Sequence, residues 1–177
     1  MSSDVRQPII IPASNRAPFQ RLGRFIRLSQ GEFSVVLVNV PTIQTRLAVL
    51  KKLRRAIAPT EIVELCLHPM VTDIYAAVES HCRHDNHQYS KILSVSGLGN
   101  LEYLDEALLR ANFARDRFQK HCPLTMIWWI DDEVSKQIRR YAPDLSSCLA
   151  APIQFMAKDS KRNQTVQSAS NLHLQYR

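Results

Sequence analysis

The amino-acid sequence predicts a three-layer α/β/α sandwich built on a mostly parallel sheet of about five strands. Short apolar runs of strand length alternate with amphipathic segments of helical spacing. The chain has 177 residues, of which 45 % are hydrophobic, which suits one folded domain with a buried core. No apolar run approaches the roughly 20 residues of a membrane-spanning helix. The N-terminus also lacks a secretory pattern, so we expect a cytoplasmic protein.

The N-terminal part predicts a lead-in followed by a short basic helix. Residues 1–18 contain three prolines among polar side chains and indicate a flexible segment. Over 19–28, apolar residues recur at helical spacing while basic residues occupy the other side. The basic residues of this helix are Arg21, Arg24 and Arg27. Such a helix either packs on the domain or docks onto a membrane surface or a partner.

Strands and helices then alternate through the α/β domain, which we assign to 19–157. The predicted strands are 33–38, 61–67, 92–95, 124–130 and 153–156. The predicted helices between them are 43–57, 71–80, 103–120 and 133–141. This alternation implies parallel pairing, right-handed crossovers and helices on both faces of the sheet. Residues 158–177 are polar and basic with little to bury, which predicts a mobile tail.

The helix predicted at 43–57 combines an apolar stripe with a basic outer face. The stripe consists of Ile43, Leu47, Leu50 and Ile57. The basic residues are Arg46, Lys51, Lys52, Arg54 and Arg55. No aromatic residues lie between them, so stacking on nucleic-acid bases is not indicated. We expect a solvated face that is available for contacts with a partner.

The net charge of +7 sits at the two ends of the chain. Residues 1–28 hold five arginines against one aspartate, and residues 158–177 hold four basic side chains against one aspartate. The intervening body is balanced, with 14 basic and 14 acidic side chains. Basic ends can add salt-sensitive affinity for phosphates, which keeps a nucleic-acid function as an alternative.

The chain lacks the residues that phosphoryl transfer needs. A phosphate loop uses glycines and a lysine to surround the anion, and residues 38–45 contain neither. The strand predicted at 92–95 is followed by Gly97-Leu98-Gly99, which indicates a turn, and no carboxylate follows closely to hold magnesium. We therefore predict no enzymatic activity, no catalytic residue and no cofactor. Nucleotide binding without hydrolysis, near Asn39, Thr42 and Gly97, remains a third alternative.

Histidines and cysteines form no recognisable site. The segment 81–87 holds three histidines and one cysteine, and Cys66 and His68 precede it, but no second paired motif fixes a metal geometry. We read this segment as a polar loop and predict no metal. The four cysteines are widely spaced, which predicts reduced thiols rather than disulfides. No serine or cysteine nucleophile signature occurs, and we read His121-Cys122 as structural.

Two further groups are candidates for interaction. Asn112, Arg115 and Asp116 share one face of the helix at 103–120, and Asp144 is a candidate partner for the arginine. They form either a structural network or a ligand contact. Trp128 and Trp129 are neighbours on one strand, so their side chains point to opposite faces of the sheet. An exposed indole there would be a binding hot spot.

Three segments carry a resemblance to a known family. They are Leu109–Phe118, Pro123-Leu124 leading to Trp128, and Tyr141-Ala142-Pro143-Asp144-Leu145. With these segments, 19–155 resembles the degenerate P-loop-like N-terminal domain of bacterial, often cyanobacterial, signal-transduction NTPases. That domain is commonly followed by tetratricopeptide repeats. The residues after Asp144 depart from the family, and phosphate-loop function does not carry over to 39–45.

The resemblance implies a P-loop-NTPase-like fold without the nucleotide-binding motifs. We expect a non-catalytic interaction, scaffold or regulatory domain that acts through protein partners. The alternative is a nucleic-acid-associated protein that uses the arginines of the first helix and the basic terminal segments. Self-association into a homo-oligomer stays open, and no membrane span is expected.

Overall fold

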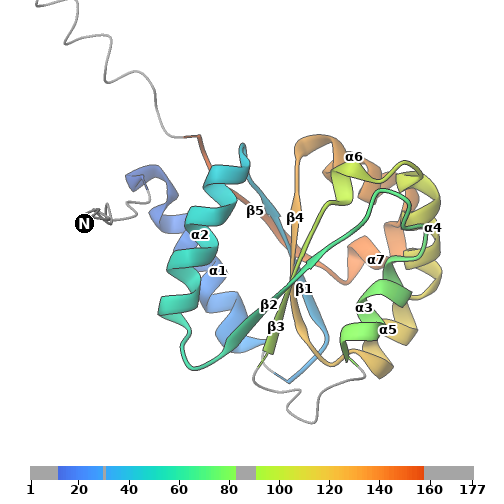
Figure 1. Ribbon diagram of the computed structural model, residues 1–177, viewed down its shortest axis with the longest axis horizontal. Coiled ribbons are helices and arrows are strands. Elements are labelled where there is room, and N and C mark those ends of the chain that lie inside the picture. The colour runs from blue at the N-terminus through green and yellow to red at the C-terminus, as the bar shows by residue number, and fades with distance from the viewer. Residues whose placement is uncertain (1–11, 30, 83–90, 158–177) are drawn as a thin grey trace, which may run out of the picture.

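A five-stranded parallel sheet lies between two helical layers (Figure 1). The computed structural model describes residues 12–29, 31–82 and 91–157. The strands are β1 (Ser34–Asn39), β2 (Glu61–Cys66), β3 (Lys91–Ser96), β4 (Thr125–Ile130) and β5 (Ala150–Gln154). Their order in the sheet is β2-β3-β4-β1-β5. The predicted fold class is confirmed.

The described ranges contain seven α-helices, of which α1 precedes β1 and the others connect successive strands. They are α1 (Arg16–Leu28), α2 (Ile43–Ala56), α3 (Ile74–Cys82), α4 (Leu104–Phe113), α5 (Arg115–His121), α6 (Asp132–Tyr141) and α7 (Pro143–Ser147). Helices α1 and α2 cover one face of the sheet, and α3 to α7 cover the other (Figure 1). None of the helices in the described ranges is long and apolar enough to cross a membrane.

Each face of the sheet has its own hydrophobic core. Trp128 of β4 lies in the core under α3 to α7, and its neighbour Trp129 lies in the core under α1 and α2. This opposite placement follows from the alternation of side chains along a strand and was predicted. Helices thus cover both faces, so the central strands β1, β3 and β4 are almost entirely buried, whereas the edge strands β2 and β5 keep exposed residues.

Helix α1 begins at Arg16, three residues before the predicted start. A 3-10 turn at Ala13–Asn15 precedes it, so part of the predicted lead-in is ordered. Pro18 is compatible with the first turn of α1, because proline lacks a backbone N–H and the first-turn amides have no acceptor within the helix. Asn15 is buried and exchanges two hydrogen bonds with the backbone of Met156, of 2.9 and 2.7 Å. This side chain ties the start of α1 to the chain after β5.

The long helix predicted at 103–120 is two helices, α4 and α5, with Ala114 between them. Phe118 of α5 is buried in the core, where its ring contacts those of Phe33, Tyr75 and Trp128. Helix α7 was not predicted, because its five residues are too few to show a helical period. Strand β5 also begins three residues earlier than predicted.

The predicted apolar stripe of α2 is only partly buried. Leu50 and Ile57 pack on the sheet, but Ile43 and Leu47 expose 58 % and 51 % of their surface. Both residues lie in the first turns of α2, close to the carboxyl end of β1. The tail at 158–177 and the three residues His84, Asp85 and His87 of the candidate metal segment lie outside the described residues.

Candidate functional site

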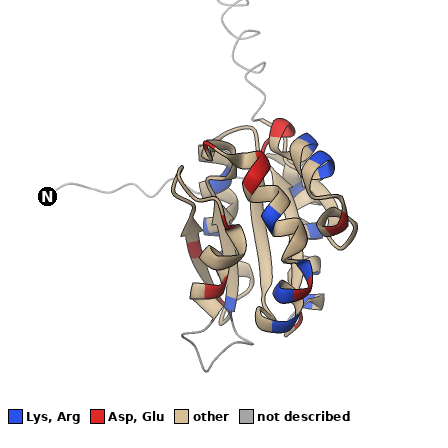
Figure 2. Cartoon of the chain, turned by 90° about the vertical axis from the view of Figure 1, so that its right-hand side faces the viewer, with Lys and Arg blue, Asp and Glu red and all other residues tan. Residues whose placement is uncertain are grey.

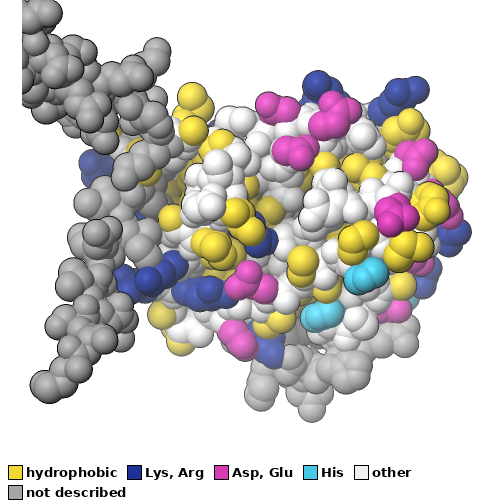
Figure 3. All heavy atoms as spheres, turned by 45° about the horizontal axis from the view of Figure 1, so that its top comes forward, with side chains coloured by type: hydrophobic (Ala, Val, Ile, Leu, Met, Phe, Trp, Pro, Cys, Tyr) yellow, Lys and Arg dark blue, Asp and Glu magenta, His cyan; other side chains and the backbone are white. Residues whose placement is uncertain are grey.

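An open cleft lies at the carboxyl ends of strands β1 to β4. In parallel α/β folds this edge is where ligands bind. The cleft has a volume of about 390 Å³. Its polar lining residues include Thr42, Arg46, Ser96, Asn100 and Asp131. Figure 3 brings this edge of the sheet forward and shows hydrophobic and charged side chains interspersed over it.

The connection from β1 to α2 does not form a phosphate cradle. Thr42 is the N-cap of α2, and its Oγ1 accepts a hydrogen bond of 3.1 Å from the Thr45 amide. One amide that an anion would use is therefore satisfied by the protein itself. The two threonine hydroxyls also lie 3.0 Å apart. Arg46 is half-buried and lines the cleft, whereas sequence analysis placed it on the outer face of the helix.

Two carboxylates that sequence analysis missed follow β4. Asp131 is the N-cap of α6 and accepts a 2.8 Å hydrogen bond from the Val134 amide. Asp132 accepts a hydrogen bond from the side-chain amide of buried Asn39, at the end of β1. The signal was present as a pair of aspartates directly after an apolar run. The sequence indicated β3 as the strand that acids would follow, but the strand order places β4 beside β1.

The end of β3 is a tight turn, as predicted. Gly97 has a φ of 91°, and a Cβ there would lie 2.7 Å from the Leu67 carbonyl oxygen. A 3-10 turn at Leu98–Asn100 follows instead of a longer helix. The turn therefore requires glycine for the backbone conformation and for the close approach of Leu67. It is not a phosphate-binding glycine motif.

Both tryptophans belong to the core. Trp128 is 0 % exposed and Trp129 is 4 % exposed. The Trp129 indole N–H donates a 2.8 Å hydrogen bond to Ser94 Oγ on β3, while Trp128 Nε1 has no hydrogen-bond partner within the described ranges. A binding hot spot would need an exposed indole, and neither tryptophan is exposed. The structure assigns these residues to packing.

The structure joins Asn112 to Asp144 by a hydrogen bond, whereas Arg115 forms its hydrogen bond with Asp116. Asn112 donates to the Asp144 carboxylate at 3.1 Å and accepts from the Leu145 amide at 2.9 Å. This residue therefore joins α4 to α7. Arg115 instead donates to its neighbour Asp116 at 3.1 Å, and this contact raises the pKa of the arginine. Asp144, the partner predicted for Arg115, thus accepts its hydrogen bond from Asn112.

Histidines and cysteines make structural contacts. His81 Nδ1 lies 3.0 Å from the Ala77 carbonyl oxygen, and His121 Nδ1 lies 3.0 Å from the Tyr75 hydroxyl. None of the four cysteines, all of which lie in the described ranges, forms a disulfide; Cys82 and Cys122 are buried, and the other two are exposed. Within the described ranges, no group of three His, Cys, Asp or Glu residues is arranged to hold a metal ion.

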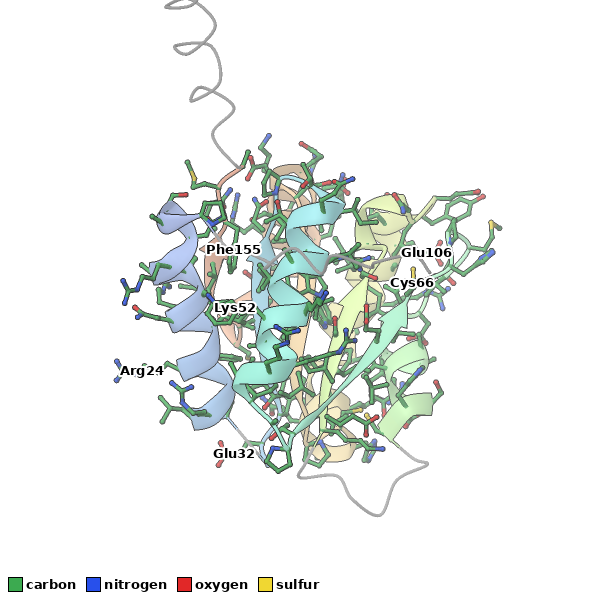
Figure 4. All side chains as sticks on the ribbon, turned by 60° about the vertical axis from the view of Figure 1, so that its left-hand side comes forward. Arg24, Glu32, Lys52, Cys66, Glu106 and Phe155 are labelled. Atoms are coloured by element: carbon green, nitrogen blue, oxygen red, sulfur yellow. The ribbon has the colours of Figure 1, made fainter. Side chains whose placement is uncertain are left out.

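The strongest charge feature is the layer formed by α1 and α2. Figure 4 shows the two helices side by side, with Arg24 pointing away from the body of the protein. From residue 12 to residue 60 the described chain holds nine basic residues and a single acid, Glu32. The basic residues are Arg16, Arg21, Arg24, Arg27, Arg46, Lys51, Lys52, Arg54 and Arg55. All of them except Arg46 are exposed.

The opposite layer carries charges of both signs. Figure 2 shows acidic and basic residues interspersed over the helices of that face. The ion pair Arg110–Glu106 joins neighbouring turns within α4, and Lys136–Glu133 does the same within α6. The body of the chain is neutral in sum, as the sequence showed, but its two faces differ. Sequence analysis missed this because the layer of each helix depends on the strand order.

Few of the α1 and α2 cations are neutralised. Arg54 pairs with Glu64 of β2, and Lys52 Nζ lies 4.8 Å from the centroid of the Phe19 ring. This second contact joins α2 to α1. Within the described ranges, Arg21, Arg24 and Lys51 have no ion-pair partner. We call the exposed basic residues of the two helices the basic layer.

The strand order, the flanking helices and the cleft at the carboxyl edge define a P-loop-NTPase-like fold. No family model matches the chain, and no curated protein matches it. The chain is similar to the ORC2 protein of Aeropyrum pernix in its ADPNP-ADP complexes, with a TM-score of 0.58, 10 % identity, and coverage of 92 % of this chain and 53 % of that one. At this identity the likeness shows the fold alone.

Two further solved structures show the same likeness. The ADP form of Aeropyrum pernix ORC2 gives a TM-score of 0.52 at 13 % identity, covering 94 % of this chain and 55 % of that chain. The structure of Aeropyrum pernix ORC1 in complex with DNA gives a TM-score of 0.55 at 12 % identity, covering 94 % of this chain and 51 % of that chain. The chain therefore spans about half the length of these proteins.

Proposed function

We propose that this protein binds nucleic acid through the phosphate backbone, using the basic layer of α1 and α2. The observation that carries this proposal is the segregation of charge between the two helical layers. Nine basic residues and one acid lie in the described chain from 12 to 60, whereas the opposite layer mixes both signs. This surface includes Arg21, Arg24 and Arg27, the arginines that the sequence analysis assigned to the nucleic-acid alternative.

Exposure and lack of pairing support the proposal. An exposed arginine or lysine that contacts a phosphate releases a condensed counterion from the nucleic acid, and this release favours binding. A cation already paired with a carboxylate contributes less. In the basic layer, Arg54 pairs with Glu64, while Arg21, Arg24 and Lys51 are exposed and have no ion-pair partner in the described ranges. A DNA complex among the similar folds is compatible with this proposal.

Binding is proposed to occur without nucleotide hydrolysis. The loop after β1 has no glycine and no lysine, and Thr42 satisfies the Thr45 amide. The two aspartates after β4 already accept hydrogen bonds from Val134 and Asn39. A cytoplasmic location and a relationship to bacterial signal-transduction NTPases belong to the proposal as well. Release of phosphate from ATP or GTP by purified protein, lost on Thr42→Ala, would contradict this part.

Binding affinity of matched variants tests the main proposal. One variant replaces Arg21, Arg24, Lys51 and Arg55 by glutamine, which suits exposed helix positions. The control replaces Arg110, Lys120, Lys136 and Arg140, which are exposed on the other layer, in the same way. We expect the first variant to lose at least about 100-fold in affinity for mixed-sequence DNA at low salt, and the control to lose less than about tenfold. Equal losses would contradict the proposal.

Protein docking on α4 is the second candidate function. Phe113 exposes 78 % and Leu109 exposes 46 % of its surface, and the two lie one helical turn apart. Exposed aromatic residues of this kind are enriched where proteins bind one another. Comparison of the proteins captured by wild-type and Phe113→Ser chains tests this function. We expect a partner retained by the first and lost by the second, with DNA binding unchanged; identical capture would contradict it.

A further inference from the structure

We infer that the ligand of the basic layer is double-stranded rather than single-stranded nucleic acid, an inference that rests on the proposed function. The basic layer is two helices wide. Helices α1 and α2 run in the same direction over one face of the sheet (Figure 1). Lys52 of α2 reaches the Phe19 ring of α1, so no other element separates them. The axes of packed helices lie about 8–10 Å apart.

The cations form a ridge on each helix. On α1 the residues Arg21, Arg24 and Arg27 follow one another at intervals of three residues, and all are exposed. On α2 the exposed pair Lys51 and Arg55 lies one helical turn apart. Both helices pack through buried residues on the same core, which fixes the ridges relative to each other. The basic layer thus presents two parallel rows of positive charge.

Two rows of charge suit the two phosphate rows that border a groove of a duplex, because each row can contact one strand. The minor groove is about 6 Å wide and the major groove about 12 Å, and the separation of packed helices falls between these values. A duplex also carries about twice as many phosphates per unit length as one strand. A single strand following one ridge would leave the other ridge without phosphate contacts.

The basic layer also lacks the stacking surface that single-strand binding uses. Proteins that bind single strands combine basic grooves with exposed aromatic side chains on which bases stack. In the described parts of α1 and α2 the aromatic residues are Phe19 and Phe25, and both pack against the core as partly buried side chains. The Phe19 ring is in addition covered by Lys52. The exposed groups of the two helices are the cations, the side-chain amides of Gln20 and Gln44, and a few aliphatic side chains.

Competition between a duplex and one of its strands tests the inference on the full chain. The probe is a labelled mixed-sequence duplex of about 20 base pairs, long enough to exceed the length of either helix. Unlabelled duplex and unlabelled single strand compete for the protein at equal nucleotide concentration. We expect the duplex to compete at least about tenfold better. Equal or better competition by the single strand would overturn this inference while leaving the proposed function intact.

Variants of one ridge at a time add a second readout. One variant is Arg21→Gln with Arg24→Gln, and the other is Lys51→Gln with Arg55→Gln. The control, Lys120→Gln with Lys136→Gln, makes the same change of charge on the other layer. For a duplex that spans both ridges, each ridge variant weakens duplex binding by at least about tenfold and reduces the preference over the single strand.

The outcomes separate the two levels of the proposal. If only one ridge variant affects duplex binding, the duplex does not span both rows and the inference is wrong. If both variants weaken duplex and single strand equally, the duplex preference is wrong, but nucleic-acid binding stands. If neither nucleic acid binds, or the control weakens binding as much as the ridge variants, the proposed function fails as well. Thermal melts of all variants check that each one is folded.

Discussion

Gly97 shows how a single backbone position shapes the edge of the cleft. Its φ of 91° lies in the left-handed region, and the Leu67 carbonyl oxygen would lie 2.7 Å from any Cβ. Residues with side chains rarely adopt this conformation, and the nearby backbone cannot move as a flexible side chain would. The turn after β3 and the segment after β2 therefore depend on this glycine for their close contact.

Gly97→Ala is expected to lower the free energy of unfolding by about 1–3 kcal/mol, since it combines a strained φ with a backbone contact. Gly23→Ala is the matched control. Gly23 is in the interior of α1, and the nearest atom to its Cβ would be the far end of Arg27, at 3.5 Å. That change is expected to raise stability by up to about 1 kcal/mol. Denaturant titration measures both; equal effects would contradict the explanation.

Tyr75 is a second residue whose surroundings define a measurable property. The ring is buried, its hydroxyl donates to Glu79, and burial and this carboxylate raise its pKa to about 12. The unfolded chain loses this proton near pH 10, while the folded protein retains it. Stability is therefore fully present below pH 10 and falls as the pH rises from 10 to about 12.

The prediction for Tyr75 is a difference between two stability profiles. The wild-type free energy of unfolding is expected to decline more steeply over this alkaline range than that of Tyr75→Phe. Removal of the hydroxyl also leaves Glu79 and His121 without one contact, so the variant starts about 1 kcal/mol less stable at neutral pH. Parallel profiles through the alkaline range would show that the tyrosine titrates normally.

At the scale of elements, α1 is held at its start and along its apolar side. Asn15 joins its start to Met156, and the apolar side of the helix packs over β5 and α2. Sequence periodicity predicted the helix and its basic side. It could not predict the Asn15 contact, because the partner lies 141 positions further along the chain. For the same reason, periodicity did not predict α7 or the break at Ala114: the Leu145 amide reaches Asn112, and Phe118 enters the core, only in the folded protein.

Asn15→Ala is expected to destabilise the protein by about 1–3 kcal/mol, because it removes two hydrogen bonds and leaves the Met156 backbone amide and carbonyl unpaired. Hydrogen exchange locates the effect. We expect faster exchange in α1 and β5, with β2 and β3 unchanged. Uniform acceleration over all strands would mean that the contact stabilises the whole domain and does not specifically hold α1.

At the scale of the molecule, the two helical layers on either side of the sheet carry different charges. The sequence predicted the fold class, most strands and the absence of a phosphate loop, since these follow from local patterns and residue types. The charge count along the chain indicated a neutral body, because such a count does not reveal that α1 and α2 share one face of the sheet. The aspartates after β4 were missed for a related reason: strand order decides which strand ends meet at the cleft.

The salt dependence of DNA binding tests the central claim most directly. Wild-type protein is expected to lose affinity steeply between about 50 and 200 mM salt, with a slope set by the number of phosphate contacts. Replacing Arg21, Arg24, Lys51 and Arg55 by glutamine is expected to reduce that slope by about 3 to 4, at about 0.9 per cation. A slope that stays unchanged in this variant, or that falls equally in the control of the opposite layer, would contradict the assignment of phosphate binding to α1 and α2.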